Sequence, residues 1–181
     1  MRTAMRTSVA AVLVAAGTFA VQTPASADSV WFADRRGDIL ASNDIEQVRV
    51  DNGSREGTEV KVVVQLRNLR FDHVDVYVNT DANDPGPEYR AGGTADSDDL
   101  TLHAVERWSS EGTLVDCPGL RVAMDTDDPS ERARFRLPRT CLDEPGAVRV
   151  AAHSSRLTSN GSQNDWAPSY RHYYPWVSLS S

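Results

Sequence analysis

The residues best suited to chemistry stand in one short loop, where oxygen-bearing side chains recur at alternate positions. Asn79, Asp81 and Asn83 occupy places one, three and five of this loop, and Asp84 and Glu88 follow around a Pro-Gly-Pro turn. This spacing lets the side-chain oxygens converge on a hard cation, and such oxygens are the ligands that Ca²⁺ prefers. The loop therefore predicts a calcium site. The alternative is a capped turn, in which the same side chains bond their own backbone two residues on.

A second set of candidate residues lies near the C-terminus, where aromatic rings alternate with polar residues. Such rings hold sugars, because the ring face stacks on the sugar while neighbouring polar groups bond its hydroxyls. The tail therefore predicts a ligand-binding surface for a polysaccharide or cell-wall glycan, carried by Trp166, Tyr170, Tyr173 and Tyr174. The alternative is that these rings pack over the edge of the domain and seal it.

The sequence lacks the common catalytic motifs. It contains no nucleophile elbow, no H-E-x-x-H pair and no glycine-rich phosphate loop, so no nucleotide is expected. Among the four histidines, no two stand at a metal-ligand spacing. No catalytic residue is assigned, and whether the protein is an enzyme stays uncertain, with the balance against it.

The chain opens with the pattern of a secretory signal peptide over residues 1–27. Arg2 and Arg6 precede an apolar run too short to span a bilayer, and Ala-Ser-Ala at 25–27 supplies the cleavage pattern. We therefore expect a secreted, extracellular protein in which residues 28–181 form a single domain without a membrane span, and which is a monomer. The net charge of −7 argues against nucleic acid as a partner.

Two cysteines, Cys117 and Cys141, make up the cysteine content of the chain. An even pair in an oxidising compartment predicts a disulfide, which would stabilise the domain by roughly 3 kcal/mol in the chain-entropy model. The bridge would hold residues 118–138 in a closed loop, and a protease inhibitor could present such a loop.

The elements that must position these residues show a period of two. Apolar and polar residues alternate in six runs, with turn residues between them, and no window carries a clean helical stripe. The runs cover residues 48–50, 60–66, 74–78, 100–104, 133–137 and 148–152. This pattern predicts an all-β antiparallel sandwich, immunoglobulin-like or jelly-roll-like, with a closed β-barrel as the alternative. Runs 60–66 and 74–78 are expected to form a hairpin through 67–73.

Several short motifs suggest a relationship. They are D-x-x-G-D at 34–38, NTDxxxPGPEY at 79–89, P-R-x-C-L at 138–142, V-R-V-A at 148–151 and D-W-A-P at 165–168. With them the chain resembles small secreted β-sandwich proteins of actinobacteria, whose outline is similar to DOMON-like and carbohydrate-binding sandwiches. The resemblance implies the fold and an extracellular setting. Haem-binding DOMON domains use a Met and a His as ligands, but Met124 has no convincing partner histidine here, so no haem is expected.

These observations predict a secreted, non-catalytic β-sandwich that binds a glycan or associates with the cell envelope and is stabilised by calcium. Two alternatives stay open, a secreted hydrolase with a site assembled from separate loops and a protease-inhibitor-like protein.

Overall fold

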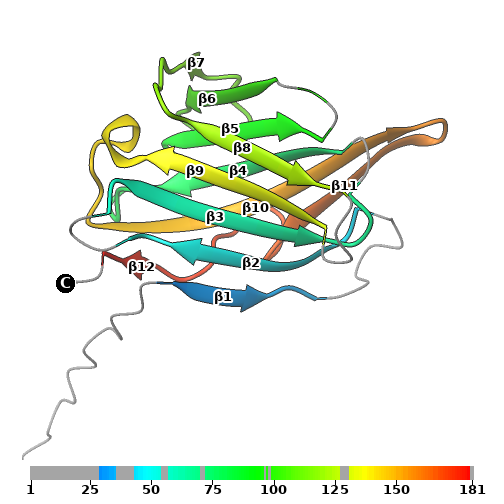
Figure 1. Ribbon diagram of the computed structural model, residues 1–181, viewed down its shortest axis with the longest axis horizontal. Helices are drawn as coiled ribbons and strands as arrows, with labels where there is room; N and C mark the ends of the chain where they lie inside the picture. Colours follow the sequence, from blue (N-terminus) through cyan, green and yellow to red (C-terminus); the bar gives the residue numbers. More distant parts are fainter. Residues whose placement is uncertain are drawn as a thin grey trace, which may run out of the picture.

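The computed structural model describes residues 29–35, 43–53, 57–69, 72–95, 97, 99–126 and 131–179, so the predicted signal peptide lies outside the described residues. The described chain forms twelve β-strands in two antiparallel sheets and contains no α-helix. The sheets lie one in front of the other, as the ribbon shows (Figure 1). The predicted all-β sandwich is confirmed. The alternative of a closed barrel is wrong, because each sheet ends in its own edge strands.

The first sheet has five strands in the order β1-β2-β3-β9-β8. Their bounds are β1 (Val30–Ala33), β2 (Ile45–Asp51), β3 (Glu59–Leu66), β9 (Arg132–Pro138) and β8 (Arg121–Asp125). Strands β2, β3 and β9 coincide closely with runs of alternating residues, because one face of each is buried and the other meets solvent.

The second sheet has seven strands in the order β11-β10-β4-β5-β6-β7, and β12 pairs with the start of β10. Their bounds are β11 (Gly161–Ala167), β10 (Ala147–Thr158), β4 (His73–Asn79), β5 (Tyr89–Thr94), β6 (Leu100–Ala104), β7 (Thr113–Leu114) and β12 (Val177–Ser178). The far end of the β10–β11 hairpin projects beyond the two layers (Figure 1).

The expected hairpin between runs 60–66 and 74–78 is wrong. Strand β3 pairs with β2 and β9 in the first sheet, whereas β4 pairs with β10 and β5 in the second. The chain therefore crosses from one sheet to the other after β3. Alternation could not reveal this crossing, because a strand buries the same residues whether its successor lies beside it or opposite it.

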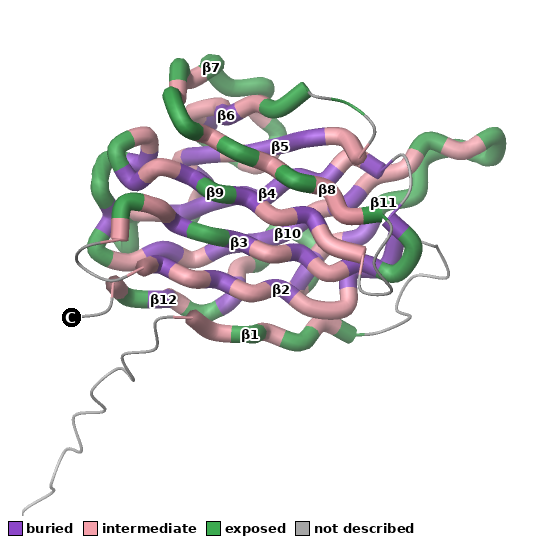
Figure 2. The backbone as a smooth tube through the Cα atoms, in the orientation of Figure 1, coloured by how far each residue is buried: buried purple, intermediate pink, exposed green. Residues whose placement is uncertain are grey.

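The core fills the space between the sheets and is rich in valine. Val62 and Val64 of β3 face Val76 and Val78 of β4 across this space, and all four are fully buried. Figure 2 shows the resulting alternation of buried and less buried positions along the strands. Functional polar groups must therefore lie on the outer faces of the sheets or at their ends.

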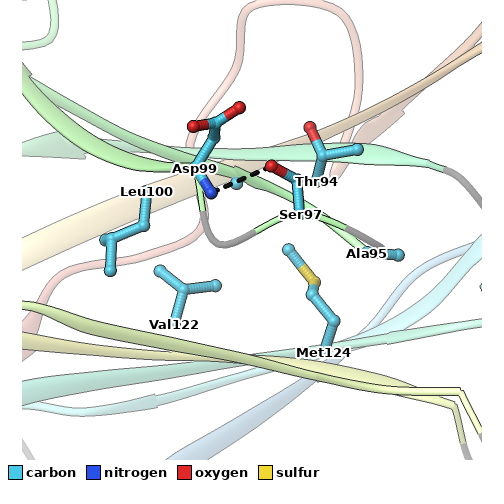
Figure 3. Close-up of a pocket in the computed structure, with 8 residues that line it drawn as sticks. Thr94, Ala95, Ser97, Asp99, Leu100, Val122 and Met124 are labelled. Carbon is cyan, nitrogen blue, oxygen red and sulfur yellow. Dashed lines mark hydrogen bonds between the residues drawn. The ribbon is translucent and has the colours of Figure 1, made fainter.

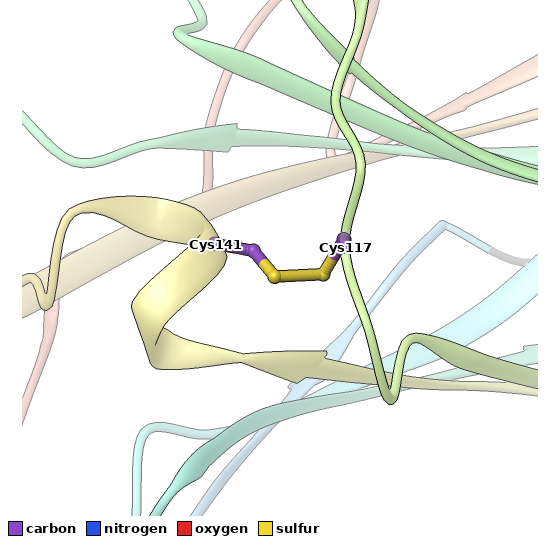
Figure 4. Close-up of a disulfide and its surroundings, with 2 residues drawn as sticks. All are labelled: Cys117 and Cys141. Atoms are coloured by element: carbon purple, nitrogen blue, oxygen red, sulfur yellow. A yellow bond between two sulfur atoms is a disulfide. The ribbon is translucent and has the colours of Figure 1, made fainter.

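The predicted disulfide is confirmed. Cys117 follows β7, and Cys141 lies in a short 3₁₀ helix, η1 (Arg139–Leu142), after β9. The sulfurs are 2.02 Å apart (Figure 4). Because β7 and β9 belong to different sheets, the bridge links the two layers covalently.

Candidate functional site

The outer face of the seven-stranded sheet carries a row of polar and aromatic side chains. On β4, Val74, Val76 and Val78 point into the core, so His73, Asp75 and Tyr77 point outward. Directly opposite neighbours in a sheet point to the same side, and the register places four residues in one line. That line runs Trp166, His153, Asp75, Gly92, from β11 to β5.

Asp75 is the centre of this face, and its carboxylate lies between two imidazoles. Its Oδ1 is 3.1 Å from Nε2 of His73, and its Oδ2 is 3.5 Å from Nδ1 of His153. The Nε of Arg90, on β5, lies 3.9 Å from the same Oδ1. Asp75 is only 8% exposed. A buried carboxylate in this setting needs its partners, because without them ionisation would be costly.

The titration of the group follows from this geometry. Burial is the largest effect on Asp75 and would raise its pKa, but the bonds with His153 and His73 together lower that pKa to about 2. The bond with Asp75 raises the pKa of His73, and this outweighs the opposing effect of burial. The carboxylate therefore stays ionised, and the imidazole of His73 more readily carries a proton.

Gly92 makes the close approach of these groups possible. A Cβ atom at this position would lie 2.6 Å from Oδ1 of Asp75 and 3.1 Å from Nε2 of His73. The first distance is shorter than real Cβ contacts allow, so any side chain here would push apart the ion pair that Asp75 forms with His73.

Five aromatic rings cover the sheet beside the ion pair, and we call them the aromatic face. They come from β4, from the connection between β6 and β7, from β11 and from the tail, and they are Tyr77, Trp108, Trp166, Tyr170 and Tyr173.

Ring contacts connect the whole aromatic face. The centroid of Trp108 is 5.2 Å from that of Tyr77 and 4.7 Å from that of Tyr173, and Trp166 lies 5.4 Å from Tyr77. Trp166 also stacks on His153 at 4.4 Å, which joins the aromatic face to the ion pair. Tyr170 contacts Trp166 at 5.5 Å and is 60% exposed, so at least this ring is open to solvent.

The structure brings together three of the four predicted ligand-binding aromatics, Trp166, Tyr170 and Tyr173. Tyr174 lies elsewhere. It is 5% exposed, and its ring stacks on Phe32 at 4.7 Å within the core cluster. The two neighbouring tyrosines thus have different partners, since the ring of Tyr173 packs on Trp108 and that of Tyr174 packs on Phe32.

The predicted calcium residues all bond within their own loop. Asp81 and Asp84 accept bonds from the backbone N–H groups of Asn83 and Gly86, and Glu88 accepts one from Thr80.

Asn79 is fully buried, and its amide donates to the carbonyl oxygens of Asp84 and Gly86. The bonds that Asp81 and Asp84 accept from backbone N–H groups two residues on are those of the capped-turn alternative, whereas the bonds of Asn79 and Glu88 reach across the loop. Within the described ranges, no group of three or more His, Cys, Asp or Glu side chains is arranged to hold a metal ion.

A cavity of about 480 Å³ lies at the open side of the sandwich, between β5 and β6 and the edge strand β8. Figure 3 shows Val122 of β8 lying toward Leu100 and the side chain of Met124 pointing toward Ser97, while the side chain of Thr94 turns away from both. The hydroxyl of Thr94 meets Nδ1 of His73 at 3.1 Å. The cavity therefore lies between the layers, separate from the polar row on the outer face, and its lining is mixed, with Ser97 and Asp99 beside the apolar residues of β6 and β8.

The sequence did not identify His73, Asp75, Arg90 and His153 as a site, because these residues belong to three different strands and no short motif joins them. Asp75 and His153 are 78 residues apart and meet through the pairing of β4 with β10. One signal was present in the sequence, namely two polar residues and a tyrosine on the wet face of a valine-rich strand.

Comparison with known proteins found no relative of this chain. No protein-family model matches the chain, no curated protein matches it, and no solved structure matches it. In the part of the chain that the structure describes, no helix has the length and apolarity to cross a membrane. The fold and the site thus define the class, a disulfide-linked antiparallel β-sandwich with an aromatic and histidine-rich outer face.

Proposed function

We propose that the protein is a secreted, non-catalytic module that binds a polysaccharide or cell-wall glycan through the aromatic face. One observation carries the proposal. Five rings from separate segments gather over the outer face of a sheet, with Tyr77 buried beneath the others and Tyr170 exposed, next to hydrogen-bonding groups of His153 and Asn164. Sugar rings stack on aromatic faces while their hydroxyls bond neighbouring polar groups.

Secretion rests on the signal-peptide pattern of residues 1–27, and the disulfide is consistent with it. The resemblance to carbohydrate-binding sandwiches points to the same ligand class. Both remain parts of the proposal.

Loss of a ring tests the function. Trp166→Ala should weaken binding to a retained polysaccharide about tenfold, which corresponds to roughly 1.4 kcal/mol. Retention on purified cell-wall and plant polysaccharides, followed by titration of the best ligand, measures this. Tyr170→Ala should act in the same direction without risk to the fold, because its ring is the most exposed of the large hydrophobic tail residues.

The five-stranded sheet offers a matched control. Trp31 lies on its outer face, 46% exposed, so Trp31→Ala removes an indole from the other side of the molecule. The affinity of the Trp31→Ala variant for the polysaccharide should equal that of the wild type. If no polysaccharide is retained, or if Trp31→Ala weakens binding as much as Trp166→Ala does, the proposal fails.

The hydrolase alternative has one observation in its favour. The hydroxyl of Thr94, the imidazole of His73 and the carboxylate of Asp75 form a continuous chain of bonds. In such a chain an imidazole can take a proton from a hydroxyl while a carboxylate orients it. Turnover of a glycan or ester that is abolished in His73→Gln would favour hydrolysis over simple binding.

The inhibitor alternative finds less support in the geometry. The segment between the cysteines forms strands β8 and β9, which pair with each other over residues 121–125 and 132–136, rather than one extended loop. A docking loop is expected to stand clear of the sheet.

Calcium stabilisation stays a prediction for the loop of residues 79–88. Two oxygens there, Oδ1 of Asn79 and Oε1 of Glu88, are buried and have no hydrogen-bond partner, so they are available to a cation. Calcium at about a hundred times its dissociation constant should stabilise the protein by roughly 2.7 kcal/mol. Thermal unfolding with calcium and with chelator measures the effect, and identical midpoints would contradict it.

A further inference from the structure

A groove extends the aromatic face past Tyr173, between the loop of residues 79–88 and the tail. Its volume is about 450 Å³, and its walls include Pro85, Arg149, Arg171, His172, Tyr173 and Trp176. Two of these side chains are guanidinium groups and none is a carboxylate, although the chain as a whole has a net charge of −7. The groove thus concentrates positive charge on an acidic protein.

Arg149 is held in place by two aromatic rings. Its guanidinium carbon lies 4.6 Å from the ring centroid of Tyr173 and 4.8 Å from that of Trp176. One terminal nitrogen donates to the backbone carbonyl of Asp84 at 3.2 Å, while the buried Nε has no partner. A guanidinium fixed in this way keeps donors for a ligand and loses little rotamer freedom when it binds one.

Arg171 also lines the groove and is exposed. Its backbone has a φ of 57°, a left-handed conformation that costs a residue other than glycine about 1 kcal/mol or more. Its guanidinium carbon lies 4.9 Å from the ring of Tyr170, and His172 donates from Nδ1 to the carbonyl of Tyr170. These contacts hold the second positive charge beside the aromatic face.

Two carboxylates lie near the groove, and one oxygen of each accepts a backbone N–H. Asp84 and Glu88 act electrostatically on Tyr173, but Asp84 accepts the N–H of Gly86 and Glu88 accepts the N–H of Thr80. Neither Arg149 nor Arg171 forms an ion pair with a described acidic side chain. Their charge is therefore free to meet an anion.

We propose that this groove binds the acidic group of an anionic glycan, between Arg149 and Arg171, while a neighbouring sugar stacks on the aromatic face. The inference rests on the proposed glycan function and deepens it by naming the ligand class. Guanidinium groups bind carboxylate and phosphate oxygens in the same bidentate manner. A uronic acid and a sugar or polyol phosphate both present such an anion.

Three oligomers with equal numbers of units test the proposal by titration at low salt. One is an oligogalacturonate, the second an oligomer of glycerol phosphate, and the third an uncharged gluco-oligosaccharide. The wild type should bind at least one acidic oligomer about tenfold more tightly than the neutral one, which is the effect of one charge-assisted contact. The preferred acidic oligomer tells a carboxylate ligand from a phosphate ligand.

Two arginine variants with equal charge change sharpen the test. Arg171→Gln should lower the affinity for the acidic oligomer about tenfold and leave that for the neutral oligomer unchanged. Arg136→Gln removes an exposed charge from the outer face of β9 in the other sheet, and both affinities should stay within about twofold of the wild type.

The outcomes separate this inference from the proposed function. Equal binding of acidic and neutral oligomers, weakened by Trp166→Ala, would overturn the anionic groove and leave glycan binding intact. Equal losses in Arg171→Gln and Arg136→Gln would also overturn it, because the effect would then be unspecific attraction. If none of the oligomers binds, both the groove and the glycan function are rejected.

Discussion

The two outer sheet faces of the sandwich have the same strand alternation but different surroundings. On the five-stranded sheet, the register sets Arg121, Arg136 and Lys61 directly opposite one another. On the seven-stranded sheet, the register sets His153, Asp75 and Gly92 opposite one another. In the first line three basic side chains are direct neighbours, and the line continues from Lys61 to Asp51 on β2. The second line contains a carboxylate beside an imidazole.

The difference comes from what covers each face. Arg121, Arg136 and Lys61 are exposed, so water screens their mutual repulsion, and their stems shield the strands. Over the seven-stranded sheet, Trp108 and the tail add a further layer of aromatic rings. Asp75 itself lies among His73, His153 and Arg90 and is buried, so each of its contacts is stronger than it would be in water. The two faces thus differ in how far their charged groups are removed from solvent.

Removal of one carboxylate from each face should give the largest contrast. Asp75→Asn leaves two imidazoles and Arg90 without their buried anion, so the free energy of unfolding should fall by about 3 kcal/mol. Asp125 forms a half-exposed ion pair with Arg134 on the other sheet, so Asp125→Asn should cost less than about 1 kcal/mol. Urea denaturation of both variants measures the difference, and equal losses would remove the contrast between the faces.

The second-largest effect is expected from acid, which should remove the contribution of Asp75 to the free energy of unfolding. The pKa of Asp75 is about 2 in the folded protein against 3.8 for the free side chain. A lowered pKa contributes stability above pH 3.8 and loses it as the pH falls through about 2, and the contribution is about 2 kcal/mol. The gap in unfolding free energy between wild type and Asp75→Asn should narrow by that amount between about pH 5 and pH 2.

On the alkaline side, His73 should show the opposite sign. Because its pKa is raised, its contribution is fully present below 6.5 and is lost as the pH rises through the folded value. The difference in unfolding free energy between wild type and Asp75→Asn should therefore become smaller at both ends of the pH range. A gap that stays constant with pH would show that the carboxylate does not interact with the histidine in this way.

A smaller effect is expected from adding one methyl group behind the ion pair. Gly92→Ala places a Cβ in contact with Asp75 and His73, which should lower the free energy of unfolding by about 1–2 kcal/mol. Gly146 has no atom within 4 Å of an added Cβ, so Gly146→Ala should change stability by less than about 0.5 kcal/mol. Thermal melts of the two variants make the comparison, and a harmless Gly92→Ala would mean that the face is less tightly packed than described.

The strands in which apolar and polar residues strictly alternate were predictable from the sequence, and so was the disulfide. Both depend on short-range information, since the pleat of one strand repeats every two residues and two cysteines in an oxidising setting have one possible partner each. The candidate site was only partly predictable. Trp166, Tyr170 and Tyr173 came from a cluster within one segment, whereas Trp108 lies some sixty residues away from them in sequence and belongs to the same face.

By itself, the sequence determined that valine-rich strands with one wet face must enclose a core as a sandwich or a barrel, because each strand can bury only its alternate residues. It also determined that Cys117 and Cys141 can join and that the acidic loop can cap its own turn. Only the tertiary structure decided which strands are neighbours. The pairing of β4 with β10 and β5 sets Asp75 beside His153 and Gly92, and Trp166 of β11 stacks on His153. Such contacts between distant segments depend on how the whole chain buries its apolar surface, and no local pattern records them.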